Sequence, residues 1–505
     1  MPIAETAYLF RHALLRDAAY QLQLPGDRAR LHGLAFALIE QLAGGPPPDP
    51  GPLEAWEKNG RPPHATDPFA EELAGHARLA RLETRRLYAR RAAEHADRNS
   101  RHGESAGLWK EYAGMVPEVE KGESLRRAAA AAHQSGQVND AGRLYRRARA
   151  VFRDAGHRLF EGVALAGLAL LEQRRGLAGQ AERHYRRALA IFRRARARRF
   201  AGIATLNLAT LCHETGRLRQ AERLYRLAIA ALGPAGARRH LGMALSNFAV
   251  LYRTVGQIGR SERCFARALA LHRRIADRRS EGSSLAGLAS LYTDTSRLKR
   301  AERTFRRALA LLRGSGDRRS EGGALLNLAS LHTKTGRLAL AGREYEEALS
   351  IQRETGDLRS EGVVQDARGR LFMKLGRFAE AAESLEEALA IHRRVRNRLS
   401  EGHALADLAE LYRRTGQLDQ ADRNFRQALA IHRSVRDRRS ESETLCRRAL
   451  LQLSLAQHRR ARRNWREGAR ILLSLHGRGD LASLSAEMRE ACAGAGVPPF
   501  DHPAT

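Results

Sequence analysis

Several features that would place this chain in a familiar class are scarce or missing. Its 505 residues contain no apolar run of about 18 or more, so the sequence predicts no membrane span. The first twenty residues place Arg11, Arg16 and Asp17 among apolar residues, unlike a signal peptide, and we expect a cytoplasmic protein. The four cysteines lie far apart and form no CxxC pair, which indicates neither a zinc site nor a disulfide framework (Cys212, Cys264, Cys446 and Cys492).

Sequence motifs for nucleotide binding and for catalysis are also scarce. The phosphate loop G-x-x-x-x-G-K-[ST] is missing, and none of the lysines follows a glycine, so we expect no nucleotide and no other cofactor. The segment Gly103 to Gly107 matches the nucleophile pattern G-x-S-x-G. That motif needs a strand before the serine, whereas the preceding Arg90 to His95 is helical in character. We therefore interpret it as a chance match and expect no enzymatic activity.

Positive charge is abundant, with 88 basic and 56 acidic residues and a net charge of +32. Only six of the basic residues are lysines and 82 are arginines, an imbalance that a GC-rich genome explains as well as selection for an anionic partner does. Either origin creates an electrostatic field at low salt. The charge is uneven, because residues 161–320 sum to +22 and residues 321–440 to only +3. A selected anion-binding strip would therefore lie on the earlier segment.

Residues 121–480 divide into nine consecutive units of 40 residues with no insertion. Apolar and small residues recur at spacings of three and four, which predicts two amphipathic helices per unit. One unit carries Ala329, His332, Gly336, Ala341, Tyr345 and Ala348, and a later copy carries Ala409, Tyr412, Gly416, Ala421, Phe425 and Ala428. We expect Tyr345 to fill the space between units, and Asp317 or Ser320 to cap a first helix. A column of glycines predicts a turn with positive φ after each first helix (Gly136, Gly176, Gly216, Gly256, Gly336, Gly376 and Gly416).

This spacing resembles the tetratricopeptide repeat signature, over about 360 of the 505 residues. The resemblance implies an all-α fold, a right-handed superhelical solenoid of tetratricopeptide-like helix pairs, whose first helices line an inner, concave face where partners bind. The usual unit has about 34 residues, so the longer unit is similar to the variety in kinesin light chains and bacterial regulators. The usual closing proline is also missing, and stretches such as Gly356-Asp357 replace it.

The remaining segments suggest further domains. Residues 44–68 hold eight of the fifteen prolines and indicate a Pro-rich linker, residues 69–120 look like degenerate helical repeats, and residues 481–505 suggest a capping helix and tail. Within residues 1–43, the stretch Phe10 to Tyr20, followed by Arg28, Leu31 and His32, resembles the helical region after the nucleotide-binding core of STAND-type ATPase regulators. That resemblance implies that the chain is the sensor half of such a regulator.

A candidate binding groove follows from two sets of polar residues on the first helices. Asn207, Asn247 and Asn327 share one repeat position, and in related arrays an asparagine at the matching place bonds the backbone of an extended peptide. One helical turn later come Arg253, Lys334, Arg413 and Arg414, which suit carboxylates or phosphates. The asparagine column is interrupted at Gly167, Gly287, Ala367 and Asp407, so ordinary polar helix surface is the alternative interpretation.

Histidines share a repeat position too, near the end of the second helix, at His272, His392 and His432. A metal ion needs its ligands at about 2 Å, whereas equivalent positions in stacked units lie a whole repeat apart, so we predict no metal site. The sequence favours a non-catalytic scaffold that binds a protein or peptide, and by resemblance the sensor arm of a signalling or transcriptional regulator. The alternative is a nucleic-acid-binding basic solenoid using residues 161–320, with weak, salt-sensitive binding.

Overall fold

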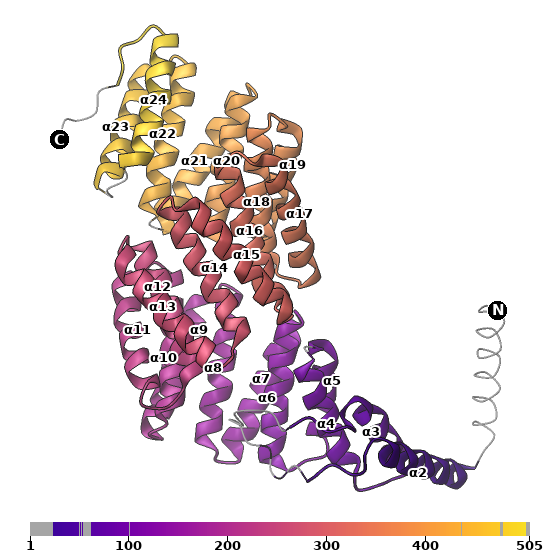
Figure 1. Ribbon diagram of the computed structural model, residues 1–505. Helices are drawn as coiled ribbons and strands as arrows, with labels where there is room; N and C mark the ends of the chain where they lie inside the picture. Colours follow the sequence, from indigo (N-terminus) through magenta and orange to yellow (C-terminus); the bar gives the residue numbers. More distant parts are fainter. Residues whose placement is uncertain are drawn as a thin grey trace, which may run out of the picture. The chain divides into compact units, whose positions relative to one another are not determined.

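A computed structural model describes residues 24–49, 51, 53, 62–99, 101–435, 437–474 and 478–500. The described residues form α-helices, one short 3-10 helix and connecting turns, and they contain no strand (Figure 1). This confirms the predicted all-α fold of helix pairs. The stretch Phe10 to Tyr20 lies outside the described residues.

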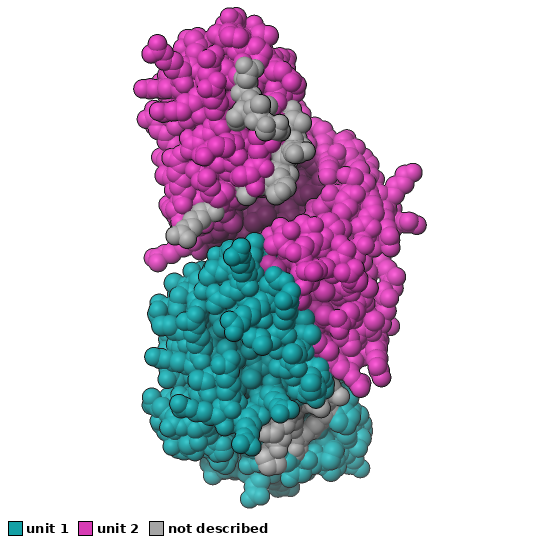
Figure 2. Space-filling view, turned by 90° about the vertical axis from the view of Figure 1, so that its left-hand side faces the viewer, with its two compact units in different colours: residues 1–237 teal, residues 238–505 magenta. Residues whose placement is uncertain are grey.

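The chain forms two compact units, residues 1–237 and residues 238–505 (Figure 2). Unit 1 contains α2 (Pro25–Leu42), η1 (Asp67–Phe69), α3 (Ala70–Leu79), α4 (Arg85–Arg98), α5 (His102–Ala113), α6 (Glu118–Gln134), α7 (Val138–Asp154), α8 (Arg158–Arg174), α9 (Ala178–Arg194), α10 (Arg198–Glu214) and α11 (Leu218–Leu232). Unit 2 contains α12 (Arg238–Thr254), α13 (Ile258–Arg274), α14 (Arg278–Asp294), α15 (Leu298–Gly314), α16 (Arg318–Lys334), α17 (Leu338–Glu354), α18 (Leu358–Lys374), α19 (Phe378–Arg394), α20 (Arg398–Arg414), α21 (Leu418–Val435), α22 (Arg438–Ser454), α23 (His458–Ser474) and α24 (Arg478–Gly494).

The helices follow the period of the sequence. From α6 onward a helix begins every 20 residues, so a first and a second helix together fill one 40-residue unit. The seven predicted turn glycines all have positive φ, between 72° and 79°, which confirms the prediction. The Asp317 carboxylate accepts a hydrogen bond from the backbone N–H of Ser320 at 3.3 Å, so Asp317 rather than Ser320 caps α16.

In the helix pairs from α6–α7 to α20–α21, a glycine of the first helix lies close to a large side chain of the second. A Cβ atom added to Gly162 would lie 2.8 Å from Cε1 of Phe192, closer than real contacts allow. The same arrangement recurs at 2.5 to 2.8 Å from Gly122 to Gly402, against Phe152, Phe192, Leu232, His272, Leu312, Gln352, His392 and His432 in turn. Glycine thus makes room for aromatic, aliphatic and polar side chains at one position.

Within each unit the first helices form the inner layer. They contact the first helix of the next pair, as α14 contacts α16 and α16 contacts α18. Among the described residues, wherever a helix from α6 onward makes extensive contact with the second helix after it, both are first helices. In a curved stack, the elements that touch their successors lie on the concave side, whereas those on the outer side spread apart. The candidate groove residues, which all belong to first helices, therefore lie in the inner layer of their units.

Candidate functional site

The clearest polar stripe of the inner layer runs along α16. Asn327, Ser330 and Lys334 are all exposed, and Gly323 one turn earlier is half-buried. Their spacings of four, three and four residues place them on one helical face. The opposite face of α16 carries Leu325 and Leu328, which are buried in the core around Tyr345. Packing of that apolar face therefore fixes the outward direction of the Asn327 side chain.

The three predicted asparagines divide between the two compact units. Asn207 is half-buried on α10 in unit 1, whereas Asn247 and Asn327 lie on α12 and α16 in unit 2. Between them, α14 carries Gly287 at the equivalent position. No side-chain hydrogen bond joins the Asn207 or Asn327 carboxamide to another described residue, whereas Asn247 is already engaged within the chain. Asn327, which is exposed and lacks such a bond, is the best-placed of the three to meet a ligand.

The predicted cations are on the inner layer, but each already has a partner in the chain. Arg253 Nη1 lies 3.2 Å from Asp294 Oδ2 on α14, and Lys334 Nζ donates to the Thr293 carbonyl at 3.4 Å. Arg413 bonds Glu410 at 2.8 Å and Glu487 of α24 at 3.1 Å, and Arg414 bonds Glu410 at 2.7 Å. The contacts of Arg253 and Lys334 join neighbouring first helices, whereas Arg413 and Arg414 bond Glu410 within α20 and Arg413 also reaches α24. A ligand carboxylate or phosphate would have to displace or share them.

Glu410 shows how firmly these pairs are held. Burial opposes ionisation of this carboxyl, but hydrogen bonds and positive charge from Arg413 and Arg414 outweigh it and hold its pKa below the usual value. Removing both arginines would leave a buried carboxylate without compensation, which is costly. Arg413 and Arg414 therefore have a structural role in addition to any contact with a ligand.

A pocket of about 620 Å³ opens at the C-terminal end of the inner layer. Arg413 of α20, Leu450 and Leu453 of α22, and Glu487 and Glu490 of α24 line it. Both leucines are almost fully buried, so the pocket has apolar walls and a charged rim. Its volume is within the range of about 300 to 1,000 Å³ typical of small-ligand sites. Sequence analysis identified only Arg413 among these residues.

A second hollow of about 590 Å³ lies between α17 and α19, over α18. Its charges neutralise one another, since Arg368 pairs with Glu346 at 2.6 Å and Arg353 pairs with Glu387 at 2.8 Å. Its bottom includes Phe372 and Leu371. Because most of the ionic groups there are paired with one another, the hollow is a weaker candidate for ligand binding than Asn327, whose carboxamide has no hydrogen bond to a described residue.

The basic residues of unit 1 extend into solvent on second helices. Arg183, Arg186 and Arg187 of α9 are all exposed, and Arg186 pairs with Glu182 at 2.7 Å. A hydrogen bond from Arg217, the residue before α11, and the charges of Arg217 and Arg186 outweigh burial and lower the pKa of Glu182. These arginines of the outer layer therefore form a solvated basic surface.

The G-x-S-x-G segment has no catalytic context. Gly103 to Gly107 lies inside α5, no described strand precedes it, and Ser105 is fully buried and donates a hydrogen bond to Asp97. A nucleophilic serine needs an exposed position on a strained turn. The structure thus agrees with the interpretation of a chance match.

Comparisons with known proteins identify the family of the repeats. The family model described as "Tetratricopeptide repeat" matches residues 162–232, 240–314, 321–394 and 360–434, together about half of the chain. No curated protein matches the chain. Within the described residues, no helix is both long and apolar enough to cross a membrane.

Solved structures with similar helix arrangements include three of note. BtubC from P. vanneervenii is 22% identical, with 44% of this chain and 91% of that chain covered and a TM-score of 0.35. The Rap conjugation gene regulator of plasmid pLS20, solved with the Phr* peptide, is 14% identical, with 57% and 77% covered and a TM-score of 0.47. A STAND protein with a tetratricopeptide repeat sensor from Pyrococcus horikoshii is 15% identical, with 95% and 67% covered and a TM-score of 0.46.

Proposed function

The chain belongs to the tetratricopeptide repeat family, and from that premise we propose that it is a non-catalytic scaffold that binds an extended protein segment on its first helices. The observation that carries the proposal is the exposed Asn327 carboxamide, which lies at the centre of an inner-layer stripe and has no hydrogen bond to a described residue. A carboxamide offers both donors and an acceptor, so it matches the N–H and C=O groups of an extended backbone. Stacked repeats also provide the long surface that such a segment needs.

The pocket beside Arg413 gives this surface a place for an anchoring side chain. Its apolar walls at Leu450 and Leu453 favour an apolar residue of the partner, and the rim at Glu487 and Glu490 favours a basic neighbour. We therefore expect the bound segment to combine one apolar anchor with adjacent positive charge.

We base a proposal for the larger protein assembly on the resemblance of the sequence to STAND-type regulators. In this proposal residues 1–43 form the region that follows an ATPase core, 44–68 a linker, 69–120 degenerate repeats, 121–480 nine repeats and 481–505 a cap. The chain would then be the sensor arm of a cytoplasmic STAND-like signalling regulator. Purification of the native assembly, followed by a search for an attached ATPase module, tests this setting.

Affinity capture from native lysate, with and without nuclease, tests the binding proposal. Changing Asn207, Asn247 and Asn327 to alanine should weaken binding of the captured protein by about 1 kcal/mol or more per lost hydrogen bond, because the carboxamides are removed. The matched control reverses Arg183, Arg186 and Arg187 on the outer layer to glutamate and should leave capture unchanged. Capture that survives the asparagine changes but fails with the arginine reversal would contradict the proposal.

The basic segment supports a second candidate function. Residues 161–320 carry a formal charge of +22, and the arginines of α9 are exposed. Such a surface attracts nucleic acid without reading sequence, and its binding falls steeply as salt rises. Titration of RNA and DNA at increasing salt distinguishes this non-specific attraction from a site that survives physiological salt.

A further inference from the structure

The loops between repeats share a recurring ion pair. In three of the 40-residue repeats, an arginine from the preceding first helix pairs with the aspartate that caps the first helix. Arg239 lies 3.0 Å from Asp277, Arg279 lies 2.7 Å from Asp317, and Arg319 lies 2.6 Å from Asp357. The arginine neutralises the carboxylate oxygen that the helix cap leaves free. Three successive junctions, α12 to α14, α14 to α16 and α16 to α18, therefore share this contact.

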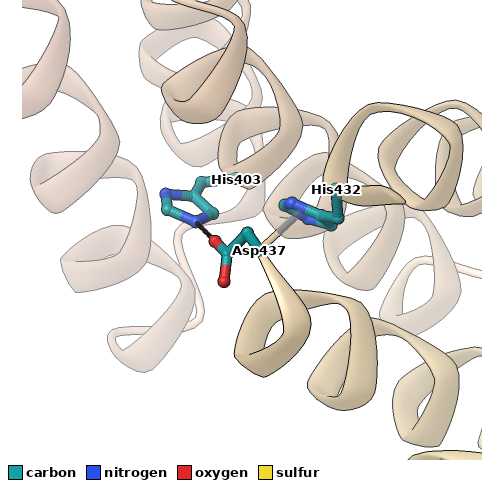
Figure 3. A group of neighbouring side chains, drawn as sticks. All are labelled: His403, His432 and Asp437. Carbon is teal, nitrogen blue, oxygen red and sulfur yellow. Dashed lines mark hydrogen bonds and ion pairs between the residues drawn. The ribbon is translucent and has the colours of Figure 1, made fainter. Parts of the chain in front are cut away.

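The junction between α20 and α22 breaks the pattern. Asp437 caps α22, accepting a hydrogen bond from the Ser440 N–H at 3.1 Å, but Leu399, which is 42% exposed, takes the position of the arginine. His403, one turn along α20, faces the carboxylate instead, with its Nε2 3.2 Å from Asp437 Oδ2 (Figure 3). Its Nε2 also lies 2.9 Å from Ser440 Oγ. An imidazole thus stands where the three earlier junctions have a guanidinium.

A second histidine completes the cluster. His432 of α21 is fully buried against Gly402, and its ring centroid lies 5.4 Å from that of His403. Neither of its ring nitrogens has a hydrogen-bond partner, which is costly for a buried polar group. A neutral imidazole with an available lone pair is a metal ligand.

We propose that His403, His432 and Asp437 form a binding site for a divalent transition metal ion such as zinc. One ligand atom from each residue lies within 4.8 Å of the others. Two imidazoles and one carboxylate are the ligand types that zinc takes, with a solvent molecule at the fourth position. The ion would occupy the role that arginine has at the other junctions, and it would give the buried His432 nitrogen a partner.

The ligands need a modest adjustment to bind. Tetrahedral coordination with bonds of about 2.1 Å sets ligand atoms about 3.4 Å apart, so the cluster has to contract by roughly 1.4 Å at its widest. His403 is able to supply this movement because it is only partly buried, with 41% of its side chain exposed. Asp437 keeps its cap through Oδ1 while Oδ2 turns to the ion. The nearby Arg433 and Arg438 both pair with the buried Glu441, which offsets much of their repulsion of a cation.

The other repeats supply internal comparisons. His272 occupies the position of His432 and is also buried without a partner, and Asp277 corresponds to Asp437. However, Met243 stands where His403 does, and Arg239 holds Asp277. In the repeat of His392, Val363 stands at the position of His403 and Asn397 at that of Asp437. The Nε2 of His392 bonds Asp366 at 2.9 Å instead. Among the three junctions with this histidine, only that of His432 holds both further ligands.

Equilibrium dialysis of the full chain against free zinc ion tests the site with two conservative variants. His403→Met copies the residue of the earlier repeat, and Asp437→Asn copies Asn397, which caps its helix from the same position. Both should fold normally by circular dichroism. Each should lose one equivalent of zinc, or bind it at least about tenfold more weakly, because one of three ligands is gone. Wild-type zinc stoichiometry and affinity in both variants would overturn the proposal.

A transplant provides the reverse test. The double change Arg239→Leu and Met243→His gives the junction of His272 and Asp277 the same three ligands and removes the competing arginine. This variant should bind one zinc equivalent more than the wild type, whereas Met243→His alone, with Arg239 still in place, should gain less. If the double variant binds no additional zinc, the three-ligand explanation is wrong.

Discussion

Replacement of Tyr345 by alanine is the sharpest test of how the repeats pack. Tyr345 of α17 is only 2% exposed and lies in a core with Ala329, Ala341 and Leu371, which come from three successive helices. Truncating a buried aromatic side chain costs about 3 to 5 kcal/mol through lost burial and the cavity that remains. The higher helix propensity of alanine returns about half a kcal/mol. We therefore expect a loss of about 3 kcal/mol in the free energy of unfolding.

The effect should also be local. In a stack of repeats, stability is close to a sum of nearest-neighbour terms, so α16, α17 and α18 should open first. Urea denaturation followed by circular dichroism measures the loss, and hydrogen exchange locates it. Tyr345→Phe is the matched control, since it removes only the hydroxyl, which lies 3.1 Å from the exposed Ser330 Oγ, and should cost about 1 kcal/mol or less. An unchanged unfolding midpoint with unchanged exchange in these helices would refute the inward-facing assignment.

Three further predictions concern ligands and pH. Without a phosphate loop, the protein should show neither micromolar binding nor hydrolysis of Mg·ATP, and saturable calorimetric binding with hydrolysis would reveal a site of another kind. Reversal of Arg183, Arg186 and Arg187 to glutamate should weaken RNA and DNA binding and flatten its salt dependence, and an unchanged salt slope in filter binding would show that these residues are not involved. Burial raises the pKa of Asp357, but Arg319 and Ser360 outweigh it and hold that pKa below the usual value, so its stabilising effect is complete above about pH 4 and is lost as pH falls through the lowered pKa. Urea unfolding between about pH 6 and pH 2.5 should therefore show a shallower acid loss for Asp357→Asn than for the wild type, and equal slopes would contradict this sign.

The regular features of this fold were predictable because they repeat. The helix pairs and the turn glycines with positive φ follow from a pattern that recurs along most of the chain. The direction of Tyr345 follows in the same way, because small residues at Ala341 and Ala348 let its helix approach the next one. The sequence left the cap of α16 open between Asp317 and Ser320, and only the hydrogen-bond geometry distinguishes them.

Other features depend on contacts that no single column reveals. The glycines from Gly122 to Gly402 form a column of their own, but their role appears only against the side chains of the second helices. Likewise, each histidine of the His272, His392 and His432 column is separated from the other two, as expected. His432 instead meets His403 and Asp437, which come from other columns. Leu399 stands at the repeat position that Arg239, Arg279 and Arg319 occupy. Comparing the residues at this position would have identified the junction from the sequence.

The predicted groove shows a different limit. Sequence analysis placed Arg253, Lys334, Arg413 and Arg414 beside the asparagines, but it did not show that carboxylates and a carbonyl of the same chain already engage them. The partners of Arg253 and Lys334 lie 41 residues away on the neighbouring first helix, and Glu487 lies 74 residues from Arg413 on α24, so the register between helices decides these pairings. Glu410 lies one turn along the same helix as Arg413 and Arg414. Their role toward a ligand stays a prediction.

Site-specific photo-crosslinking tests the central claim, that a partner segment binds the inner layer of first helices. A photoreactive residue replaces either Ser330 of α16, next to Asn327 on the inner stripe, or Ser350 of α17, an exposed serine on the second helix of the same pair. We predict that the protein captured from nuclease-treated lysate at physiological salt crosslinks at position 330 and not at position 350. Crosslinking at position 350 without any at position 330 would contradict the account.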